Sequence, residues 1–553
     1  MYLTEWVCAA LSLEHAGLAR VARPRPAPLG AGLAGGVVAV RLDDLAALEC
    51  ADGSRVLAPA TAGRVREGDL VAWCCVVAVA PVTVDADGRV AAQGWLPDHV
   101  RLGVLEEHLG EGVVERVVAG AAPPPQTRGR QRLMSLPLVA RLVLAMTLLP
   151  HGSYVEALAQ LVGPLPRLAW TRGWHVPSST VITDWRRRLG VAPMRELFWR
   201  VAGHIVAAAD PAGVWHGLRV CALDGSQVRV PDTEANRAAF GPADGPFPLP
   251  RVVLATARAG RAILGAIIDA CHVGEQTLIA RLLDERPDLF TSEHVYLVDR
   301  NFLGFELIEA IHRGGQGAHL VMRVKDGIKL PVIKRFPDGS YESYLRSRDG
   351  RRRLRLRVVE YDITLPGGEV SELFCVATSL LDHEAHPAAA IADLYQQRWS
   401  AAETTIGECK STITDAGPSR GPILRSEEPE LVRQEIWAWL AATQLTRRSA
   451  HAATLTTTGV SPDQISFTVA RREATRSMVQ GLVTATSSPA ALADAAERAA
   501  RAALANLVTI DRDRHSPRTQ KSLPKFPHTA TTKTTTRGPL PINLNKPPPP
   551  DTS

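Results

Sequence analysis

The sequence predicts an α/β domain that is interrupted by a β-rich block and flanked by helical regions. Short β-type runs alternate with helical segments over residues 213–319, which is typical of a sheet covered by helices. Residues 320–385 then read almost entirely as strands and turns, and helical periodicity returns over residues 386–450. The β-rich block is therefore predicted to be an insertion between a first and a second part of the α/β domain.

Composition narrows the class of protein. The chain has 553 residues, of which 46% are hydrophobic and 22% charged, so it is neither wholly disordered nor a disulfide-stapled miniprotein. Its longest apolar stretches fall short of a membrane span, and its first residues lack the basic region of a secretory signal. Eight cysteines without a C-x-x-C pair indicate reduced thiols, so we expect a cytoplasmic protein with no membrane partner. The net charge of +6 permits a nucleic-acid partner without requiring one.

The N-terminal part of the chain divides into two regions. Residues 1–97 are rich in Ala, Val, Gly and Pro, and no function is assigned to them. They are interpreted either as a small β-rich module or as an over-long start of the chain. Residues 98–205 are predicted to be helical, because apolar side chains recur at helical spacing from Leu133 to Val162 and a further helix runs from about Pro177 to Gly190. Arginines of this region are candidates for binding DNA phosphates, although an arginine run is as often a solvated helix face. They are Arg130, Arg132, Arg186, Arg187 and Arg188.

The α/β region is built from recognisable β-type runs. In the first part these runs are Leu218–Leu223, Arg251–Ala255, Ala262–Ile268 and His294–Val298, and helices are predicted at Gln276–Glu285 and Gly304–Arg313. In the insertion the runs are His319–Val324, Leu354–Thr364 and Val370–Thr378.

The C-terminal part is predicted to be helical and then disordered. A strongly apolar helix at Glu430–Ala450 carries Trp437 and Trp439, which we expect in the core. Residues 451–514 continue as a helical region, and Ser461 begins a capping box. Residues 515–553 are rich in Thr, Pro and Lys and are predicted to be a disordered basic tail.

Three acidic residues stand where a metal site is expected. Asp224 and Asp299 each follow an apolar strand-type run, and Glu403 lies in the helical stretch Ile391–Ile413. Two carboxylates at the ends of neighbouring strands, with a third from a facing helix, would form a cage of hard oxygen ligands suited to Mg²⁺. A pair of such ions can stabilise both the attacking and the leaving oxygen of a phosphoryl displacement. Strand-end aspartates also cap turns, which is the commoner role for any one of them.

These segments resemble three signatures of bacterial insertion-sequence DDE transposases, most closely the insertion element four family. The matching segments are Ala222–Ser226, Val295–Phe302 and the helical stretch that holds Tyr395, Arg398, Glu403 and Lys410. The resemblance covers about residues 98–450 and implies a ribonuclease-H-like catalytic core, a mixed sheet with flanking helices, with a β-rich insertion before the final glutamate.

The resemblance also implies an activity. Asp224, Asp299 and Glu403 would hold two Mg²⁺ ions, for which Mn²⁺ can substitute, while water cuts the element end and the freed 3′-hydroxyl attacks target DNA. The partners implied are double-stranded DNA, as terminal inverted repeats and as target, and a second copy of the chain in a paired-end dimer at the nucleoid. Two alternatives remain: an inactive or domesticated DNA-binding derivative, and a nuclease or resolvase of the same fold without strand transfer.

Four further residues would contact DNA phosphates by the same resemblance: Tyr395, Arg398, Lys410 and Arg300, the last of which is equally suited to a structural ion pair. The family has three residues between the arginine and the glutamate, whereas this chain has four. At about 100° per residue, Glu403 and Lys410 share a helix face but Arg398 lies about 140° away, so a bulge or a helix that starts after Arg398 is expected. Glu408 is the rival third carboxylate, at a less suitable spacing from Lys410.

Overall fold

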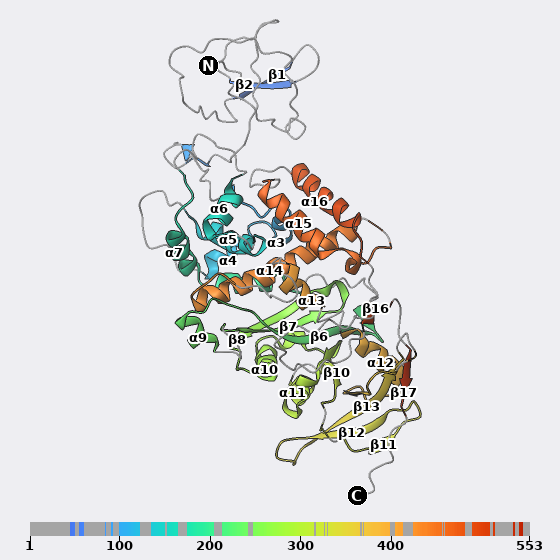
Figure 1. Cartoon of the computed structure of the whole chain (residues 1–553). Coiled ribbons are helices and arrows are strands. Elements are labelled where there is room, and N and C mark those ends of the chain that lie inside the picture. Colours follow the sequence, from blue (N-terminus) through green and yellow to red (C-terminus); the bar gives the residue numbers. More distant parts are fainter. Residues whose placement is uncertain are drawn as a thin grey trace. The chain divides into compact units, whose positions relative to one another are not determined.

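The structure is a computed structural model of the chain (Figure 1). It describes residues 99–121, 134–149, 152–163, 174–203, 213–241, 247–314, 317–325, 327–328, 330–364, 368, 370–398, 404–412, 424–455, 457, 459–481, 489–508 and 541–545, together with a few isolated short strands. The chain divides into two compact units, one of residues 1–100, 165–175 and 484–488 and the other of the remaining residues.

The first unit is described at two antiparallel strand pairs. In one pair β1 (Leu45–Glu49) lies beside β2 (Arg55–Pro59), and in the other β3 (Thr83–Val84) lies beside β4 (Val90–Ala91). Most of residues 1–97 lie outside the described residues, so the β-rich module stays a prediction.

The second unit begins with the predicted helical region. Its helices are α3 (Leu105–Leu109), α4 (Val113–Ala121), α5 (Leu136–Leu148), α6 (Tyr154–Val162), α7 (Ser179–Leu189) and α8 (Ala192–Val201). Serines begin α5 and α6, where Ser135 accepts the N–H of Leu138 and Ser153 forms a capping box with Glu156. The helical periodicity predicted from Leu133 to Val162 thus corresponds to α5 and α6.

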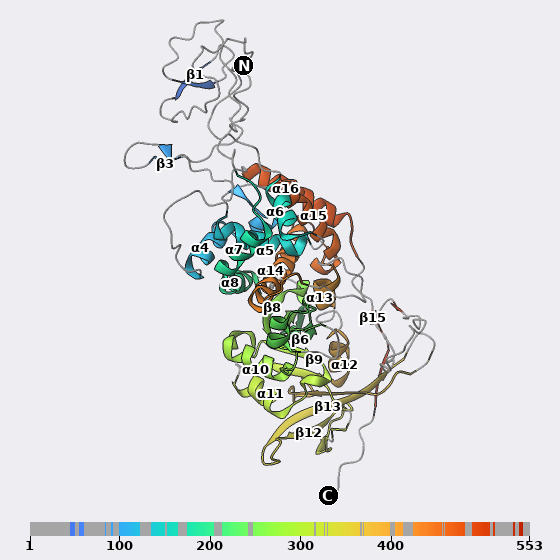
Figure 2. The ribbon, with the colours of Figure 1, turned by 60° about the vertical axis from the view of Figure 1, so that its left-hand side comes forward.

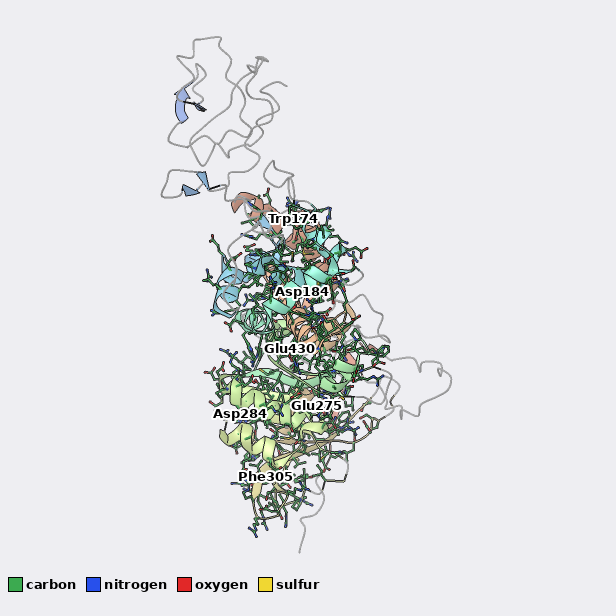
Figure 3. All side chains as sticks on the ribbon, turned by 90° about the vertical axis from the view of Figure 1, so that its left-hand side faces the viewer. Trp174, Asp184, Glu275, Asp284, Phe305 and Glu430 are labelled. Carbon is green, nitrogen blue, oxygen red and sulfur yellow. The ribbon has the colours of Figure 1, made fainter. Side chains whose placement is uncertain are left out.

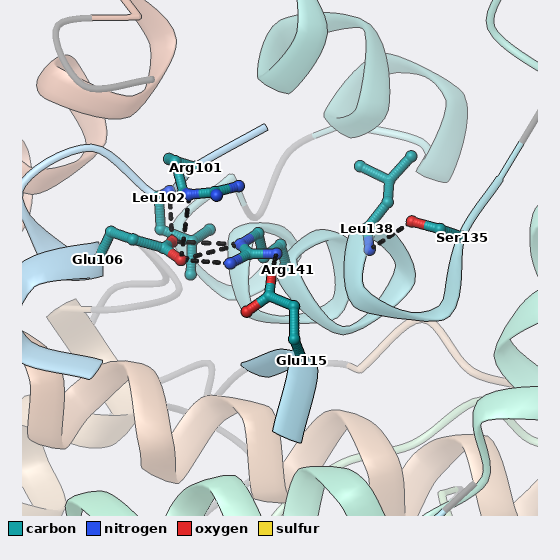
Figure 4. Close-up of polar contacts among 7 residues, drawn as sticks. All are labelled: Arg101, Leu102, Glu106, Glu115, Ser135, Leu138 and Arg141. Carbon is teal, nitrogen blue, oxygen red and sulfur yellow. Dashed lines mark hydrogen bonds and ion pairs between the residues drawn. The ribbon is translucent and has the colours of Figure 1, made fainter. Parts of the chain in front are cut away.

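A buried ion-pair cluster joins three of these helices (Figure 4). Arg141 of α5 is 2% exposed, and its Nη2 donates to Glu106 at 2.5 Å while its Nη1 donates to Glu115 at 2.8 Å. Burial opposes ionisation of Glu115, but the hydrogen bond and charge of Arg141 hold the pKa of this carboxyl below its ordinary value. The cluster thus fixes α3 and α4 against α5.

The predicted α/β core is a mixed sheet. Its strands run in the order β8 (Ile263–Asp269), β7 (Arg251–Ala257), β6 (Leu218–Gln227), β9 (His294–Val298) and β10 (His319–Arg323). Neighbouring strands β6, β9 and β10 are parallel, whereas β7 is antiparallel to both β6 and β8. This order confirms the ribonuclease-H-like fold class. Most strand bounds are close to those predicted, but β6 continues four residues past the predicted end at Leu223, so Asp224 lies inside the strand.

Helices cover both faces of the sheet. One apolar core lies under α10 (Glu275–Glu285) and α11 (Phe305–Glu309), and a second lies under α12 (Ala388–Gln396). Figure 3 marks Glu275 and Asp284 near the two ends of α10. The long helix α14 (Pro429–Thr454) runs between the sheet and the helical region in both Figure 1 and Figure 2, and its Trp437 and Trp439 are buried as predicted.

The β-rich block extends the same sheet rather than standing apart from it. Strand β14 (Phe374–Thr378) pairs with β10, and beyond it lie β13 (Arg353–Ile363), β12 (Tyr341–Arg346) and β11 (Lys334–Arg335). The predicted disorder of residues 515–553 is wrong at one point, because β17 (Ile542–Leu544) pairs with β13 and Ile542 packs on the core under α12. Pairing with β13 and packing of the apolar Ile542 side chain stabilise this strand, although the tail as a whole is rich in Thr and Pro.

The remaining described helices are α9 (Glu234–Phe240), α15 (Phe467–Val479) and α16 (Pro489–Leu504). None of the described helices is long and apolar enough to cross a membrane. Among the described cysteines, Cys221, Cys271, Cys375 and Cys409 form no disulfide.

Candidate active site

Asp224 and Asp299 lie side by side at one edge of the sheet. Parallel pairing of β6 and β9 places Leu223 opposite Val298, and each is followed by an aspartate, Asp224 inside β6 and Asp299 directly after β9. Neighbouring strands are about 4.8 Å apart, so the two backbones hold the carboxylates within reach of a shared cation. The predicted meeting of these two residues is therefore present in the structure.

Each aspartate also accepts a hydrogen bond from the next backbone N–H, Asp224 inside β6 and Asp299 at the start of the turn that follows β9. Asp224 Oδ1 accepts the N–H of Gly225 at 2.8 Å, and Asp299 Oδ1 accepts the N–H of Arg300 at 2.7 Å. Turn capping and cation binding are compatible, because a carboxylate has further lone pairs beyond those used in one hydrogen bond. Arg300 begins the short 3-10 helix η7 (Arg300–Phe302) and is half-buried there.

Tyr395 reaches this edge from α12. It is 5% exposed, and its hydroxyl lies 3.4 Å from the carbonyl oxygen of Val298, the residue before Asp299. Burial raises the pKa of Tyr395 to about 12, with Arg398 opposing the rise and the charge of Asp299 adding to it. Tyr395 is thus a neutral hydrogen-bond donor at neutral pH, and Arg398 hydrogen-bonds to it just after the end of α12.

The first residues of α12 are held by a turn of the insertion. The helix has no side-chain cap of its own at Pro387, but Asp338 Oδ2 accepts the N–H of Ala388 at 2.9 Å. Asp338 Oδ1 accepts the N–H and the hydroxyl of Ser340, at 3.0 and 2.6 Å. Asp338 therefore positions the helix that carries Tyr395.

We expect Asp338→Asn to destabilise the protein by about 1–2 kcal/mol at neutral pH, because it weakens these charge-assisted hydrogen bonds. Burial alone would raise the pKa of Asp338, but the bonds from Ser340 and Ala388 and the charge of Arg357 lower it below 3.8. A lowered pKa gives stability that is present above about pH 4 and is lost as the pH falls through the folded-state value. Urea unfolding at pH 7 and pH 3 should show the wild-type advantage over the variant shrinking at pH 3, and a difference independent of pH would contradict this assignment.

Lys410 approaches Asp224 from a second helical segment. It lies in a π-helical turn, η10 (Glu408–Thr412), that continues α13 (Thr404–Gly407). Burial lowers the pKa of Lys410, and the charge of Asp224 acts in the opposite direction. The turn is fixed by α14, since Trp439 Nε1 donates to the carbonyl oxygen of Cys409 at 2.9 Å.

Glu403 itself lies outside the described residues, so its predicted convergence with the two aspartates stays a prediction. The helical stretch predicted over Ile391–Ile413 is not one described helix, because α12 ends at Gln396 and α13 begins at Thr404. The chain turns at Gln397 and is helical again at Arg398, so the described break lies before Arg398. The predicted bulge or helix start after Arg398 falls on residues 399–403, which lie outside the described residues, and it stays a prediction.

Glu408, the rival third carboxylate, is engaged elsewhere. Arg261 Nη1 donates to Glu408 Oε1 at 2.6 Å, and the fully buried Arg447 forms an ion pair with the same carboxylate. The structure thus favours a structural role for Glu408, which supports Glu403 as the catalytic candidate.

The arginine run of α7 does not act as one DNA-binding face. Arg186 is 0% exposed and hydrogen-bonds Gln434 and Ser426, each at 2.9 Å, so its predicted phosphate contact is corrected to a structural role. Arg187 pairs with Glu428, and Arg188 is exposed over the ring of Trp185. The signal for Arg186 was its helical spacing from the buried Ile182 and Leu189. Arg130 and Arg132 lie outside the described residues.

One acidic residue near the site was missed by sequence reasoning. Glu275, the first residue of α10, lies against Gly225, the residue after Asp224. Burial raises the pKa of Glu275, Arg251 opposes the rise, and the charge of Asp299 adds to it. No sequence motif marks this position, because the first residue of an amphipathic helix carries no periodic signal.

The donor chemistry suits divalent cations, although the described residues do not form a complete cage. Asp224 and Asp299 supply hard oxygen ligands from adjacent strands, and Glu275 increases the negative charge around them. No group of three or more His, Cys, Asp or Glu side chains able to hold a metal ion is found within the described ranges, from which Glu403 is absent. The two aspartates thus fit as part of a site that needs a further ligand.

Two family models and several known transposases match parts of the chain. Residues 99–199 match the family model described as insertion element 4 transposase N-terminal, and residues 215–445 match the transposase DDE domain. The chain is 27% identical over 349 residues to the transposase InsG for insertion sequence element IS4 of Escherichia coli (strain K12), covering 61% of this chain and 75% of that protein. A cryo-EM structure of a piggyBac transposase synaptic complex with hairpin DNA aligns at 10% identity and a TM-score of 0.37, covering 72% of this chain and 84% of that one.

Proposed function

Because the chain is a member of the insertion element 4 family of DDE transposases, we propose that it binds the terminal inverted repeats of its own element, cleaves the DNA there and joins the freed 3′-hydroxyl to target DNA. The observation that carries this proposal is the register of the parallel strands β6 and β9, which sets Asp224, inside β6, beside Asp299, directly after β9. The proposed substrate is chromosomal DNA, so the enzyme would act at the nucleoid, as a dimer on paired ends.

Asp224, Asp299 and Glu403 would hold two divalent ions, Mg²⁺ or Mn²⁺. When bound, such ions activate the attacking oxygen and neutralise charge on the leaving oxygen of a phosphodiester. The protein's own groups complete the site from the α12 face of the sheet. The phenol of Tyr395 donates a hydrogen bond, Arg398 offers a planar fork to a phosphate, and Lys410 supplies a point charge near Asp224. Arg300 and the exposed Arg188 are further candidates for phosphate contacts.

The test is a strand-transfer assay with Mg²⁺, the DNA that flanks the coding region and a second labelled duplex. We expect labelled products in which a cut 3′ end is joined to the second duplex. Fragments without joined product would assign the protein to the nuclease or resolvase alternative. Binding of the flanking DNA without cleavage would assign it to the inactive or domesticated alternative.

A further inference from the structure

Glu275 occupies space that a side chain at residue 225 would need. A Cβ atom built on Gly225 would lie 2.2 Å from Glu275 Oε1 and 2.7 Å from its Cδ. Gly225 lies inside β6, which continues to Gln227, and it leaves room for the Glu275 carboxylate on the face of the sheet that α10 covers. Because side chains alternate along a strand, Glu275 packs on the face opposite the Asp224 side chain. Of the two aspartates it is Asp299, directly after the end of β9, whose charge acts on Glu275.

The beginning of α10 is fixed at this position by a neighbouring contact. Gln276 Nε2 donates to the carbonyl oxygen of Asn301 at 2.7 Å, which ties α10 to η7, the turn that follows Asp299. Gln276 also packs on Gly304, where a Cβ would lie 2.4 Å from its Oε1. Two glycines thus allow the start of α10 to approach β6 and the segment that follows Asp299.

With the residues that the structure describes, the Glu275 carboxylate forms no hydrogen bond and no ion pair within 4 Å. Two charged groups are near enough to influence it: Asp299, which is of like charge, and Arg251, whose Nη1 instead donates to the carbonyl oxygen of Val273 at 3.2 Å. A half-buried carboxylate beside another carboxylate, without a paired cation, is an unfavourable arrangement unless a cation joins it.

We propose that Glu275 is an outer ligand of the divalent-ion site, accepting a hydrogen bond from water bound to the ion that Asp299 holds. The proposal rests on the metal site of the proposed function. It extends that site from the α10 face of the sheet, opposite the face from which Tyr395 approaches. An outer position fits the observation that the described carboxylates do not close a cage by themselves, and Mg²⁺ usually keeps several waters.

The experiment is a Mn²⁺ titration of the full-length protein, with free Mn²⁺ measured by electron paramagnetic resonance. Outer ligands typically change metal affinity by about 10–100-fold, so we expect Glu275→Gln to weaken Mn²⁺ binding by at least about tenfold. Asp284→Asn is the matched control, because it removes one carboxylate from the exposed far end of the same helix and should leave affinity within about twofold. Gly225→Ala should weaken binding as Glu275→Gln does, since the new methyl group displaces the flexible Glu275 side chain.

A thermal melt in EDTA separates this role from a purely structural one. With no metal present, Glu275→Gln should melt at or above the wild-type temperature, because it removes repulsion against Asp299. A lower melting temperature, with Mn²⁺ affinity unchanged, would make Glu275 a structural partner of Arg251 and would overturn the proposal.

The titration also separates this proposal from the proposed function. Wild-type binding that is lost in Asp299→Asn but retained in Glu275→Gln would overturn only the role of Glu275. Absence of Mn²⁺ binding in the wild type, or full binding in Asp299→Asn, would overturn the metal site itself and the Glu275 proposal with it.

Discussion

Asp299→Asn is expected to reduce Mg²⁺-dependent cleavage and joining at the element end by at least about a thousandfold. Metal ions contribute several kcal/mol of transition-state stabilisation to phosphoryl displacement, and each 1.36 kcal/mol is a factor of about ten in rate. Asparagine keeps the shape of the side chain and its turn-capping oxygen but removes the charge that attracts the ion. Asp224→Asn should have an effect of the same order, because the two residues are register neighbours on β6 and β9.

Asp269→Asn is the matched control for both variants. Asp269 ends β8 at the same edge of the sheet, since it pairs with Arg251 in the register and Arg251 pairs with Gln227. It lies two strands from Asp224 and forms an ion pair with the exposed Arg281, so its replacement should leave the rate nearly unchanged. The rate of joined-product formation is the measurement. Equal losses in all three variants, or a folding defect in Asp299→Asn, would argue against a metal-binding role for the strand-end pair.

The catalytic sheet was predictable because its strands are short apolar runs with clear ends. The β9 run, His294–Val298, has the same bounds in the structure as in the sequence prediction. The meeting of Asp224 and Asp299 could be predicted from the parallel arrangement of two neighbouring apolar runs, whereas the continuation of β6 to Gln227 could not. Pairing of β17 with β13 was not predictable in this way, because it joins residues about 180 positions apart through a strand of three residues.

The side chains that act from outside the strands were less predictable. The charge of Arg186 suggested an exposed residue. In the structure its guanidinium is buried and donates hydrogen bonds to Gln434 and Leu431 of α14 and to Ser426, which precedes α14. Glu275 reaches the site only because Gly225 leaves space, and this steric relation joins residues that are distant in sequence. Such contacts depend on how helices pack on the sheet, which local sequence patterns do not encode.

Glu408→Gln is expected to destabilise the protein by about 3–5 kcal/mol, the usual effect of breaking a buried ion pair by removing one partner. Glu408 and Asp463 together face three guanidinium groups, those of Arg258, Arg261 and Arg447. Removal of the Glu408 charge leaves these three groups against one carboxylate, with Arg447 fully buried. Because Glu408 begins the turn that carries Lys410, the lost anchor should also loosen that turn. Thermal unfolding followed by circular dichroism should therefore show a melting temperature lowered by several degrees.

Two further variants make this prediction specific. Glu408→Gln combined with Arg447→Met removes one charge of each sign and restores the original balance of the cluster, so it should recover part of the lost stability. Glu403→Gln should abolish cleavage while leaving the melting temperature unchanged, because its proposed role is in catalysis. If instead Glu408→Gln abolished cleavage at an unchanged melting temperature while Glu403→Gln still cleaved DNA, Glu408 would be the third catalytic carboxylate. If Glu408 is a buried structural anchor and Glu403 a metal ligand, Glu408→Gln should lower the melting temperature, and Glu403→Gln should abolish cleavage without lowering it.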